Sequence, residues 1–151
     1  MITAWRIVRA EYAEGAFNGK GARFTHGRWH IGLPIVYTAS SISLATLELL
    51  VRLDKPHIYA LSIVPCYFHE VLVESVDRRL LPLNWRHSPP SPETQRIGNE
   101  WLLSRSSVVL EVPSAVTPDE SNYLLNPEHP DFASVDVGEP QHFIPDYRLH
   151  T

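Results

Sequence analysis

The stretch "GRWHIGLPIVYTASSISLATLELLVRL", residues 27–53, is the most informative for the fold, because its pattern predicts a glycine turn, a strand and a helix in succession. Its segment 34–39 is short, apolar and β-favouring, which predicts a buried strand. Serines then precede a run of helix-forming residues that ends near Pro56, so we expect a helix over 40–54.

Further strands and one more helix are predicted on both sides of this stretch. Alternating apolar and polar side chains predict a strand over 3–10. A proline at a helix entry predicts a helix over 92–105. The other expected strands are 57–65 and 69–76, then a strand followed by a turn within 107–116, with edge strands at 133–137 and 141–145. This order of elements predicts an α+β fold, and the length predicts one domain over 1–151.

Two segments are expected to be loops. Five of the seven glycines fall between residues 15 and 32, and such a stretch lets the backbone approach a ligand closely. Residues 82–92 carry four prolines, which predicts a surface excursion, and the sequence assigns no role to the wider segment 78–95.

The composition argues against several classes of function. A formal net charge of −4 and a pI near 6.0 leave no broad basic surface, so direct nucleic-acid binding is not expected. The single Cys66 excludes an internal disulfide and a multi-cysteine zinc site. His26 and His30 lie beside glycines rather than on a helix, which does not favour a metal. No signal peptide or membrane span is visible, so we expect a cytoplasmic protein without membrane contact.

Glu48 is the most informative candidate for chemistry. Apolar residues surround it on nearly every face of the predicted helix, so this helix should be mostly buried. A carboxylate there is costly unless it is paired or faces a cleft. Two interpretations stay open: an i,i+4 pair with Arg52, or a carboxylate that points into a pocket between helix and sheet.

Two arginines flank the glycine-rich loop. Arg6 lies in an otherwise apolar strand and Arg28 follows Gly27, and either one alone is commonly just solvated or paired. Together they suit a diphosphate, which arginine binds through two parallel hydrogen bonds. Tyr37 could be a core tyrosine or a platform for a flat ring. The residues alone therefore predict a small α+β domain with an Arg/Tyr/Glu cleft.

The chain resembles the RES-domain family, the toxins of bacterial toxin–antitoxin pairs. The resemblance rests on "WRIVR", the 27–53 stretch, "LEVPSAV" and "SNYLLNPEHPDF" in this order, and it covers residues 5 to about 148. It implies a compact domain with a curved, split β-sheet flanked by helices, similar to ADP-ribosyltransferases. It also implies that NAD+ is the substrate, bound in a cleft of this sheet, with no metal involved.

The resemblance implies roles for individual residues. Glu48 would be the catalytic carboxylate, and Arg28 and Tyr37 would belong to the same catalytic set. Arg6 and Arg28 would bind the phosphates and ribose of NAD+, and Tyr37 would stack on the nicotinamide ring.

Three further residues follow in the downstream motifs. Ser114 would hold the substrate or Glu48 in place, and Asn122 and Asn126 would face the cleft. From the sequence, all three are expected in turns after a strand, where Ser and Asn usually serve the turn itself.

Several functional alternatives stay open. Members of the family break the nicotinamide–ribose bond, so the acceptor would be water, phosphate or a protein side chain. Water or phosphate would deplete cellular NAD+ and arrest growth, whereas a protein acceptor would make the chain an ADP-ribosyltransferase. A non-enzymatic binding module also remains, in which Glu48 only pairs with Arg52. The resemblance further implies an Xre-type helix-turn-helix antitoxin that blocks the cleft and contacts DNA itself, and a homodimer or larger toxin–antitoxin complex is plausible.

Overall fold

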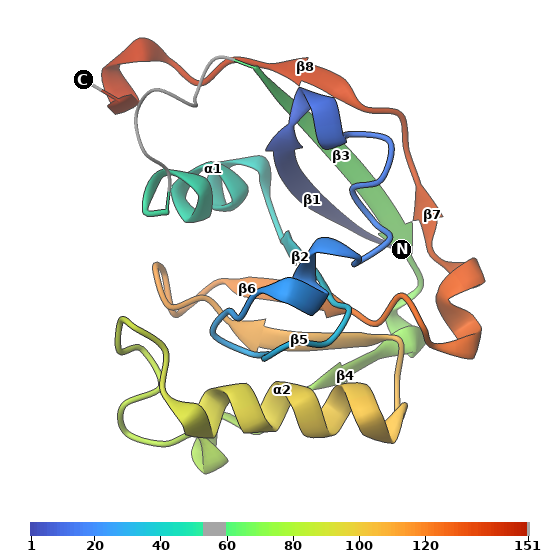
Figure 1. Cartoon of the computed structure of the whole chain (residues 1–151), viewed down its shortest axis with the longest axis vertical. Helices are drawn as coiled ribbons and strands as arrows, with labels where there is room; N and C mark the ends of the chain where they lie inside the picture. The colour runs from blue at the N-terminus through green and yellow to red at the C-terminus, as the bar shows by residue number, and fades with distance from the viewer. Residues whose placement is uncertain (53–59, 151) are drawn as a thin grey trace.

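The computed structural model describes residues 1–52 and 60–150. These residues form one mixed β-sheet with two α-helices, the α+β fold that the sequence predicts (Figure 1). The helices are α1 (Ile42–Leu50) and α2 (Pro92–Ser104). The strands are β1 (Ile2–Arg9), β2 (Val36–Ala39), β3 (Leu61–Phe68), β4 (Val73–Ser75), β5 (Val109–Pro113), β6 (Ser121–Leu125), β7 (Asp136–Val137) and β8 (Gln141–Phe143).

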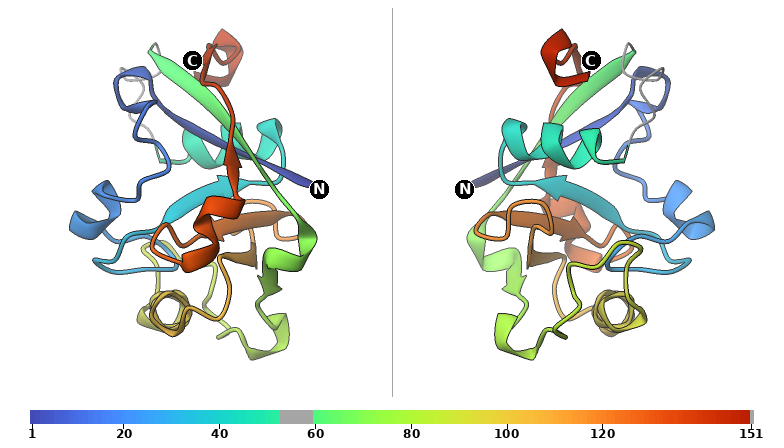
Figure 2. Two further views of the ribbon diagram at one scale, coloured as in Figure 1. Left: turned by 90° about the vertical axis from the view of Figure 1, so that its right-hand side faces the viewer. Right: turned by 90° about the vertical axis from the view of Figure 1, so that its left-hand side faces the viewer.

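The sheet splits between β1 and β2. Its strand order is β4-β5-β6-β2-β1-β3-β7, with β8 beside β3, and only β4 and β5 are parallel. β1 pairs with β3 along its whole length, whereas β1 and β2 share the single pair Trp5↔Ala39. The two halves diverge from this point, and the resulting curved sheet is visible from the side in Figure 2.

Each helix covers a different part of the split sheet. α1 packs on β1 and β2, and its buried residues Leu44 and Leu49 join a cluster with Ile7 and Ile63. α2 lies along the lower half of the molecule in Figure 1. Its Trp101 and Leu102 pack in a second cluster with buried residues of β5 and β6.

A third cluster joins the two halves of the sheet. Cys66 and Phe68 from β3 pack in it with Val109 and Tyr123 from the other half. The rings of Phe68 and Tyr123 meet edge to face, with centroids 5.4 Å apart. The halves are therefore connected by apolar packing where backbone pairing is minimal.

Some element boundaries differ from the sequence predictions. Asn122 was expected in a turn, but it lies in β6 between β5 and β2, because this strand is buried and shows no alternation of polar and apolar residues. The strand expected over 69–76 begins with a 3-10 helix at 70–72. The strand expected over 57–65 is β3, shifted toward the C-terminus, and positions 57–59 lie outside the described residues.

Helix α1 is shorter and more exposed than expected. It spans Ile42–Leu50 instead of 40–54, and positions 53 and 54 lie outside the described residues. Its residues Ile42 and Leu47 and the following Val51 are exposed, so the expectation of a mostly buried helix is only half right. The reason is that α1 packs by one side only, on β1 and β2. No helix in the described part of the chain is long and apolar enough to cross a membrane.

Candidate active site

Helix α1 carries Glu48 at the split of the sheet. The hydroxyl of Ser41 caps the helix by accepting a hydrogen bond from the backbone N–H of Leu44. The Glu48 side chain is half-buried, and its Oε1 accepts a hydrogen bond of 2.7 Å from Ser114 Oγ. Arg52 Nε donates to the backbone carbonyl of Glu48 at 3.0 Å. The interpretation of Glu48 and Arg52 as an ion pair is therefore wrong: no ion pair among the described residues joins them.

The hydroxyl of Ser114 can donate in only one direction. Ser114 is fully buried at the end of β5, where the backbone N–H groups of Val116 and Thr117 both donate to its Oγ at 3.1 Å. These two bonds occupy both lone pairs of the hydroxyl, so its hydrogen is directed to Glu48. Oε2 of Glu48 makes no hydrogen bond to the described residues. One carboxylate oxygen is thus fixed and the other is available.

Tyr37 on β2 is held by its hydroxyl. His30 Nε2 lies 3.2 Å from the carbonyl of Ala22, which can only accept, so Nε2 carries the hydrogen and Nδ1 accepts from the Tyr37 hydroxyl at 2.7 Å. The backbone N–H of Trp29 donates to the same hydroxyl at 3.3 Å. Burial raises the pKa of Tyr37 and lowers the pKa of His30, so both side chains are neutral near pH 7.

Arg6 bridges the split in the sheet. Its Nη1 donates from β1 to the backbone carbonyl of Tyr37 on β2 at 3.0 Å. Burial, and secondarily the charge of Arg52, lower the pKa of Arg6 to about 10, which still leaves it charged at neutral pH. Its Nε is buried without a hydrogen-bond partner among the described residues. A buried cation with an unused donor is costly, and such a group suits an anionic ligand.

Arg28 is held by the segment before α2. Its Nη1 donates to the carbonyls of Trp85 at 2.7 Å and His87 at 2.8 Å. Its Nε and Nη2 have no hydrogen bond to the described residues, and this edge of the guanidinium can bind a phosphate through two parallel bonds. Burial lowers the pKa of Arg28 while the charge of Glu48 acts in the opposite direction, so these two groups are close enough to interact.

The two predicted asparagines lie in different places. Asn122 pairs with Ala39 across β6 and β2, so it shares the sheet face of Tyr37, two residues away from Ala39. Asn126 is buried, and its Nδ2 donates to the carbonyl of Leu102 on α2 at 3.1 Å. The expectation that Asn126 faces the cleft is corrected: its side chain links the end of β6 to α2.

Helix α2 fixes the glycine turn, which the sequence analysis did not anticipate. Gln95 Nε2 donates to the carbonyl of Gly27 at 3.0 Å. Asn99 bonds both to the N–H of Ile31, at 3.1 Å, and to its carbonyl, at 3.2 Å. Gly98 lies between them, where a Cβ would meet the carbonyl oxygen of Trp29. The sequence could have indicated this contact, because Gln95, Gly98 and Asn99 are spaced so that they share one face of the helix.

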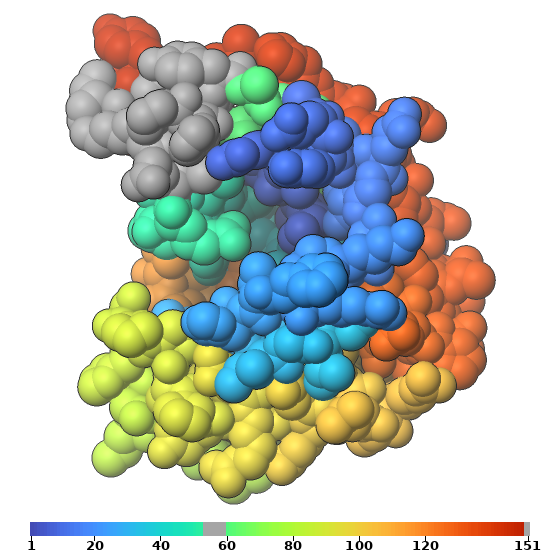
Figure 3. All heavy atoms as spheres, in the orientation of Figure 1, coloured from blue at the N-terminus to red at the C-terminus, as the bar shows by residue number. Residues whose placement is uncertain are grey.

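Figure 3 shows the surface hollowed between α1 and the yellow-green segment around residues 82–91, with the orange loop after β5 at its floor. We call this region the hollow. The charges of Arg6, Arg28 and Arg52 all act on the pKa of Tyr37, so three cations lie within electrostatic reach of this side chain. From the sequence, Arg52 was expected only as an ion-pair partner of Glu48, not as a cation near Tyr37. A carboxylate, a partly exposed ring and three cations can together bind an anionic ligand with a flat group.

Away from the hollow, the described residues include a small cavity and no cluster of metal ligands. No group of three or more His, Cys, Asp or Glu that could hold a metal ion occurs in the described residues. A cavity of about 120 Å³ beside β4, β5 and β6 includes Glu111, whose carboxylate accepts from Ser75 and Ser121 at 2.8 and 2.7 Å. None of the predicted site residues lines this cavity.

The chain is similar to several known proteins. The RES domain family model matches residues 3–149. A protein named "Toxin Res" from Photorhabdus laumondii is 41% identical over 130 residues, which cover 85% of this chain and 83% of that protein. A protein named "Prs ADP-ribosylating toxin" from Sphingobium sp. is 35% identical over 158 residues, covering 96% and 94% of the two chains. A chain in the crystal structure of the M. tuberculosis MbcT–MbcA toxin–antitoxin complex has a TM-score of 0.79 at 17% identity, covering 95% of this chain and 85% of that chain. This likeness shows the shared fold.

Proposed function

The chain belongs to the RES-domain family, and on this premise we propose that it is a toxin that cleaves the bond between nicotinamide and ribose in NAD+. The observation that carries the proposal is the 2.7 Å hydrogen bond through which Ser114 fixes Glu48, a carboxylate whose charge acts on the pKa of Arg28. This arrangement gives a fixed carboxylate within electrostatic reach of a cation that has a free edge.

The residues present fit the parts of NAD+. The diphosphate carries the negative charge that the unused donors of Arg6 and Arg28 require. The nicotinamide ring is flat and suits the ring of Tyr37, whose hydroxyl is already engaged with His30 and Trp29. The available oxygen of Glu48 suits a ribose hydroxyl.

Glu48 would act by stabilising positive charge. When the bond between the ribose carbon and the nicotinamide nitrogen breaks, its electron pair stays with nicotinamide, which leaves as a neutral molecule. The positive charge then develops on the ribose, as in glycoside hydrolysis. Because Ser114 already holds the carboxylate in place, little reorganisation is needed when this charge appears. An acceptor then adds to the ribose carbon and releases a proton.

The acceptor distinguishes two candidate functions. With water or phosphate as the acceptor, the chain would consume NAD+ as a glycohydrolase or a phosphorylase. We propose this depletion of NAD+ as the primary activity. The relative named "Prs ADP-ribosylating toxin" favours a second candidate, in which a protein side chain accepts ADP-ribose.

Nicotinamide release from NAD+ by the purified chain tests the proposal. We expect release by the wild type, and a loss on the order of 10²–10³ in Glu48→Gln, which keeps the size of the side chain but removes its charge. Glu100→Gln, at an exposed position of α2, is the matched control and should retain the wild-type rate. Folded wild type that releases no nicotinamide, or a Glu48→Gln variant as fast as the wild type, would contradict the proposal. NAD+ labelled in the adenylate distinguishes the acceptors, since label on a macromolecule supports the second candidate.

The proposal includes a partner and a setting. We propose that a helix-turn-helix antitoxin of the Xre type covers the hollow, a partner that the fold shared with a toxin–antitoxin complex supports. Such a pair can assemble as a dimer or a larger complex. We further propose that residues 1–151 act as a single RES domain in the cytoplasm, where NAD+ is consumed; the family match over residues 3–149 supports one domain.

A further inference from the structure

The segment before α2 contacts both sides of the hollow through three consecutive residues. The carbonyls of Trp85 and His87 accept from Arg28 on one side. The residue between them, Arg86, points to the other side, where its Nε donates to the carbonyl of Ala115 at 3.0 Å. One tripeptide therefore joins the cation of the site to the loop after β5. We call residues 85–87 the strap.

The loop reached by the strap is the loop that fixes Glu48. Ala115 follows Ser114 directly, and the next two residues donate their N–H groups to the Ser114 hydroxyl. A shift of the Ala115 carbonyl would therefore move the turn that directs the Ser114 hydrogen to Glu48. Arg86 is thus two hydrogen bonds away from the carboxylate.

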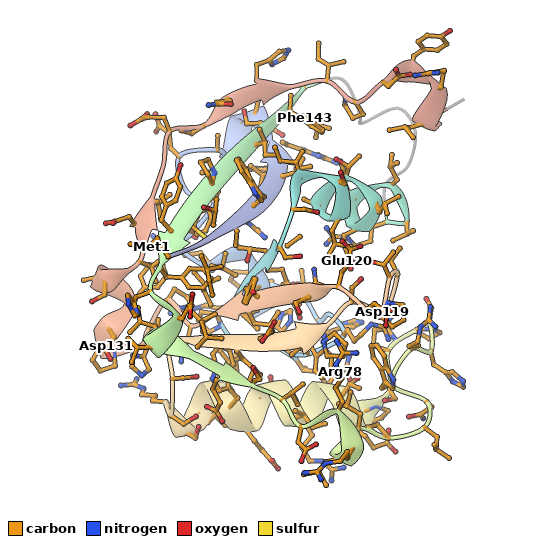
Figure 4. All side chains as sticks on the ribbon, turned by 180° about the vertical axis from the view of Figure 1, so that it is seen from behind. Met1, Arg78, Asp119, Glu120, Asp131 and Phe143 are labelled. Atoms are coloured by element: carbon orange, nitrogen blue, oxygen red, sulfur yellow. The ribbon has the colours of Figure 1, made fainter. Side chains whose placement is uncertain are left out.

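A second arginine of the same segment holds the same loop. Arg78 Nη1 donates to the carbonyl of Pro118 at 2.7 Å. Figure 4 shows Arg78 at the same end of the sheet as Asp119 and Glu120, which follow Pro118. The loop over 114–120 is thus attached at two points to the segment that the sequence left without a role.

The strap itself is ordered by local structure. The N–H of Trp85 donates to the carbonyl of Pro82 at 3.1 Å, and the N–H of His87 donates to that of Asn84 at 2.9 Å. The Trp85 side chain packs against the cluster that contains Trp29. Two successive turns and a packed indole ring hold the strap in place. The strap can therefore fix the positions of the two groups that it contacts, Arg28 and the carbonyl of Ala115.

We propose that Arg86 is a positioning residue of the active site. It holds the Ser114 turn, and through that turn it holds Glu48, at a fixed position relative to Arg28, whose guanidinium binds the carbonyls of Trp85 and His87. The kinetic part of this proposal rests on the proposed NAD+ cleavage. The competing interpretation is that Arg86 binds the substrate directly, since it is a cation near enough to Arg28 to lower the pKa of that residue.

Two substitutions separate positioning from substrate binding. Gln places its Nε2 the same number of bonds from Cα as the Nε of Arg, so Arg86→Gln keeps the donor to Ala115 and removes the charge. Arg86→Leu removes both. Arg79→Leu is the matched control, since Arg79 lies in the same segment, is 88% exposed in its side chain and, among the described residues, forms side-chain bonds only with the nearby Asp77.

Steady-state kinetics of nicotinamide release test the proposal. We expect Arg86→Leu to lower kcat by about 10- to 100-fold with little change in KM, the size of effect that a small misplacement of a reacting group causes. Arg86→Gln should restore most of this loss, and Arg79→Leu should match the wild type. Two outcomes overturn the proposal: full activity in Arg86→Leu, or a raised KM in both Arg86 variants, which would show direct binding of substrate.

Hydrogen exchange gives a readout that does not depend on activity. The N–H groups of Val116 and Thr117 are protected by Ser114 Oγ. They should exchange faster in Arg86→Leu than in Arg86→Gln or the wild type, while amides of α2 stay unchanged. Equal exchange in all three proteins overturns the positioning role. If instead the wild type releases no nicotinamide but the exchange pattern is as expected, the proposed reaction is wrong. The inference that Arg86 holds the Ser114 turn would still be supported.

Discussion

His30 joins the glycine turn to Tyr37 through two hydrogen bonds that need a neutral imidazole. Nε2 donates to Ala22 and Nδ1 accepts from the Tyr37 hydroxyl, and a second proton on the ring would turn the hydroxyl hydrogen away from its acceptor. The ring is 2% exposed, so water cannot replace either partner. The position of Tyr37 therefore depends on the protonation state of one histidine.

Lowering the pH should remove the contribution of His30 to stability. Because burial lowers its folded-state pKa below 6.5, the unfolded chain binds the proton first, and stability falls as pH drops from about 6.5 toward the folded-state pKa. At pH 7.5, His30→Leu should be less stable than the wild type by about 1–3 kcal/mol, since it leaves a buried hydroxyl and carbonyl unpaired. At pH 5.5 this gap should narrow, by at most about 1.4 kcal/mol for one proton over one pH unit.

Urea unfolding of both proteins at the two pH values measures this change. His142→Leu, at an exposed position of β8, is the matched control for loss of a histidine as such. A gap for His30→Leu that stays constant or widens at pH 5.5 would show that the imidazole is not held neutral.

At the scale of elements, the sequence predicts what depends on local pattern. The capped helix after "VYTA", the helix that begins at Pro92 and the strand over 3–10 all occur within a few residues of their expected places. Glu48, Arg28, Arg6 and Tyr37 come together because the elements that carry them are adjacent in the fold. The elements could be predicted from periodicity and capping, and the choice of these four residues also drew on the resemblance.

The contacts that the sequence could not predict join distant segments through the backbone. Arg28 bonds to carbonyls 57 and 59 residues away. Because every residue has a backbone carbonyl, the sequence does not indicate which of them accepts a hydrogen bond. The same holds for Arg86 and Ala115. The buried strand β6 also escaped prediction, because a strand covered on both faces has no alternating pattern.

The contact between α2 and the glycine turn depends on Gly98. A Cβ at this position would overlap the carbonyl oxygen of Trp29, and backbone cannot move aside as a flexible side chain can. Ala is the better helix former by about 1 kcal/mol, so propensity alone predicts stabilisation. We expect the opposite: Gly98→Ala should destabilise by about 1–3 kcal/mol, the usual cost of overpacking.

Thermal or urea unfolding measures this effect. Gly21→Ala is the matched control, since a Cβ at Gly21 would meet nothing within 4 Å. It should be neutral or slightly stabilising. The hydrogen bonds from Gln95 and Asn99 to the turn should weaken in Gly98→Ala, which a faster exchange of the Ile31 amide would report. A Gly98→Ala variant as stable as the wild type would show that the turn can move away from α2 at no cost.

The whole molecule is a split sheet whose two halves are joined mainly by side chains. Only one residue pair connects β1 to β2, and Arg6 adds a bond across the gap to the Tyr37 carbonyl. The apolar cluster around Phe68 and Tyr123 crosses from one half to the other. A hollow at such a split can be lined by residues from both halves, and it stays fixed only if the halves fold as one unit.

The rate at which Cys66 is labelled by a thiol reagent can show whether the two halves of the sheet fold as one unit. Cys66 is the single cysteine of the chain, it is fully buried in β3, and burial raises its pKa to about 12. A thiol reagent at pH 8 should therefore label it only when the protein opens. Gly98 lies on the other half, on α2. If the molecule unfolds cooperatively, Gly98→Ala should speed Cys66 labelling by the factor that its loss of stability sets, about tenfold for each 1.4 kcal/mol. Unchanged labelling in a destabilised Gly98→Ala variant would instead mean that the half with α2 opens alone, and that the hollow loses one wall while the other remains folded.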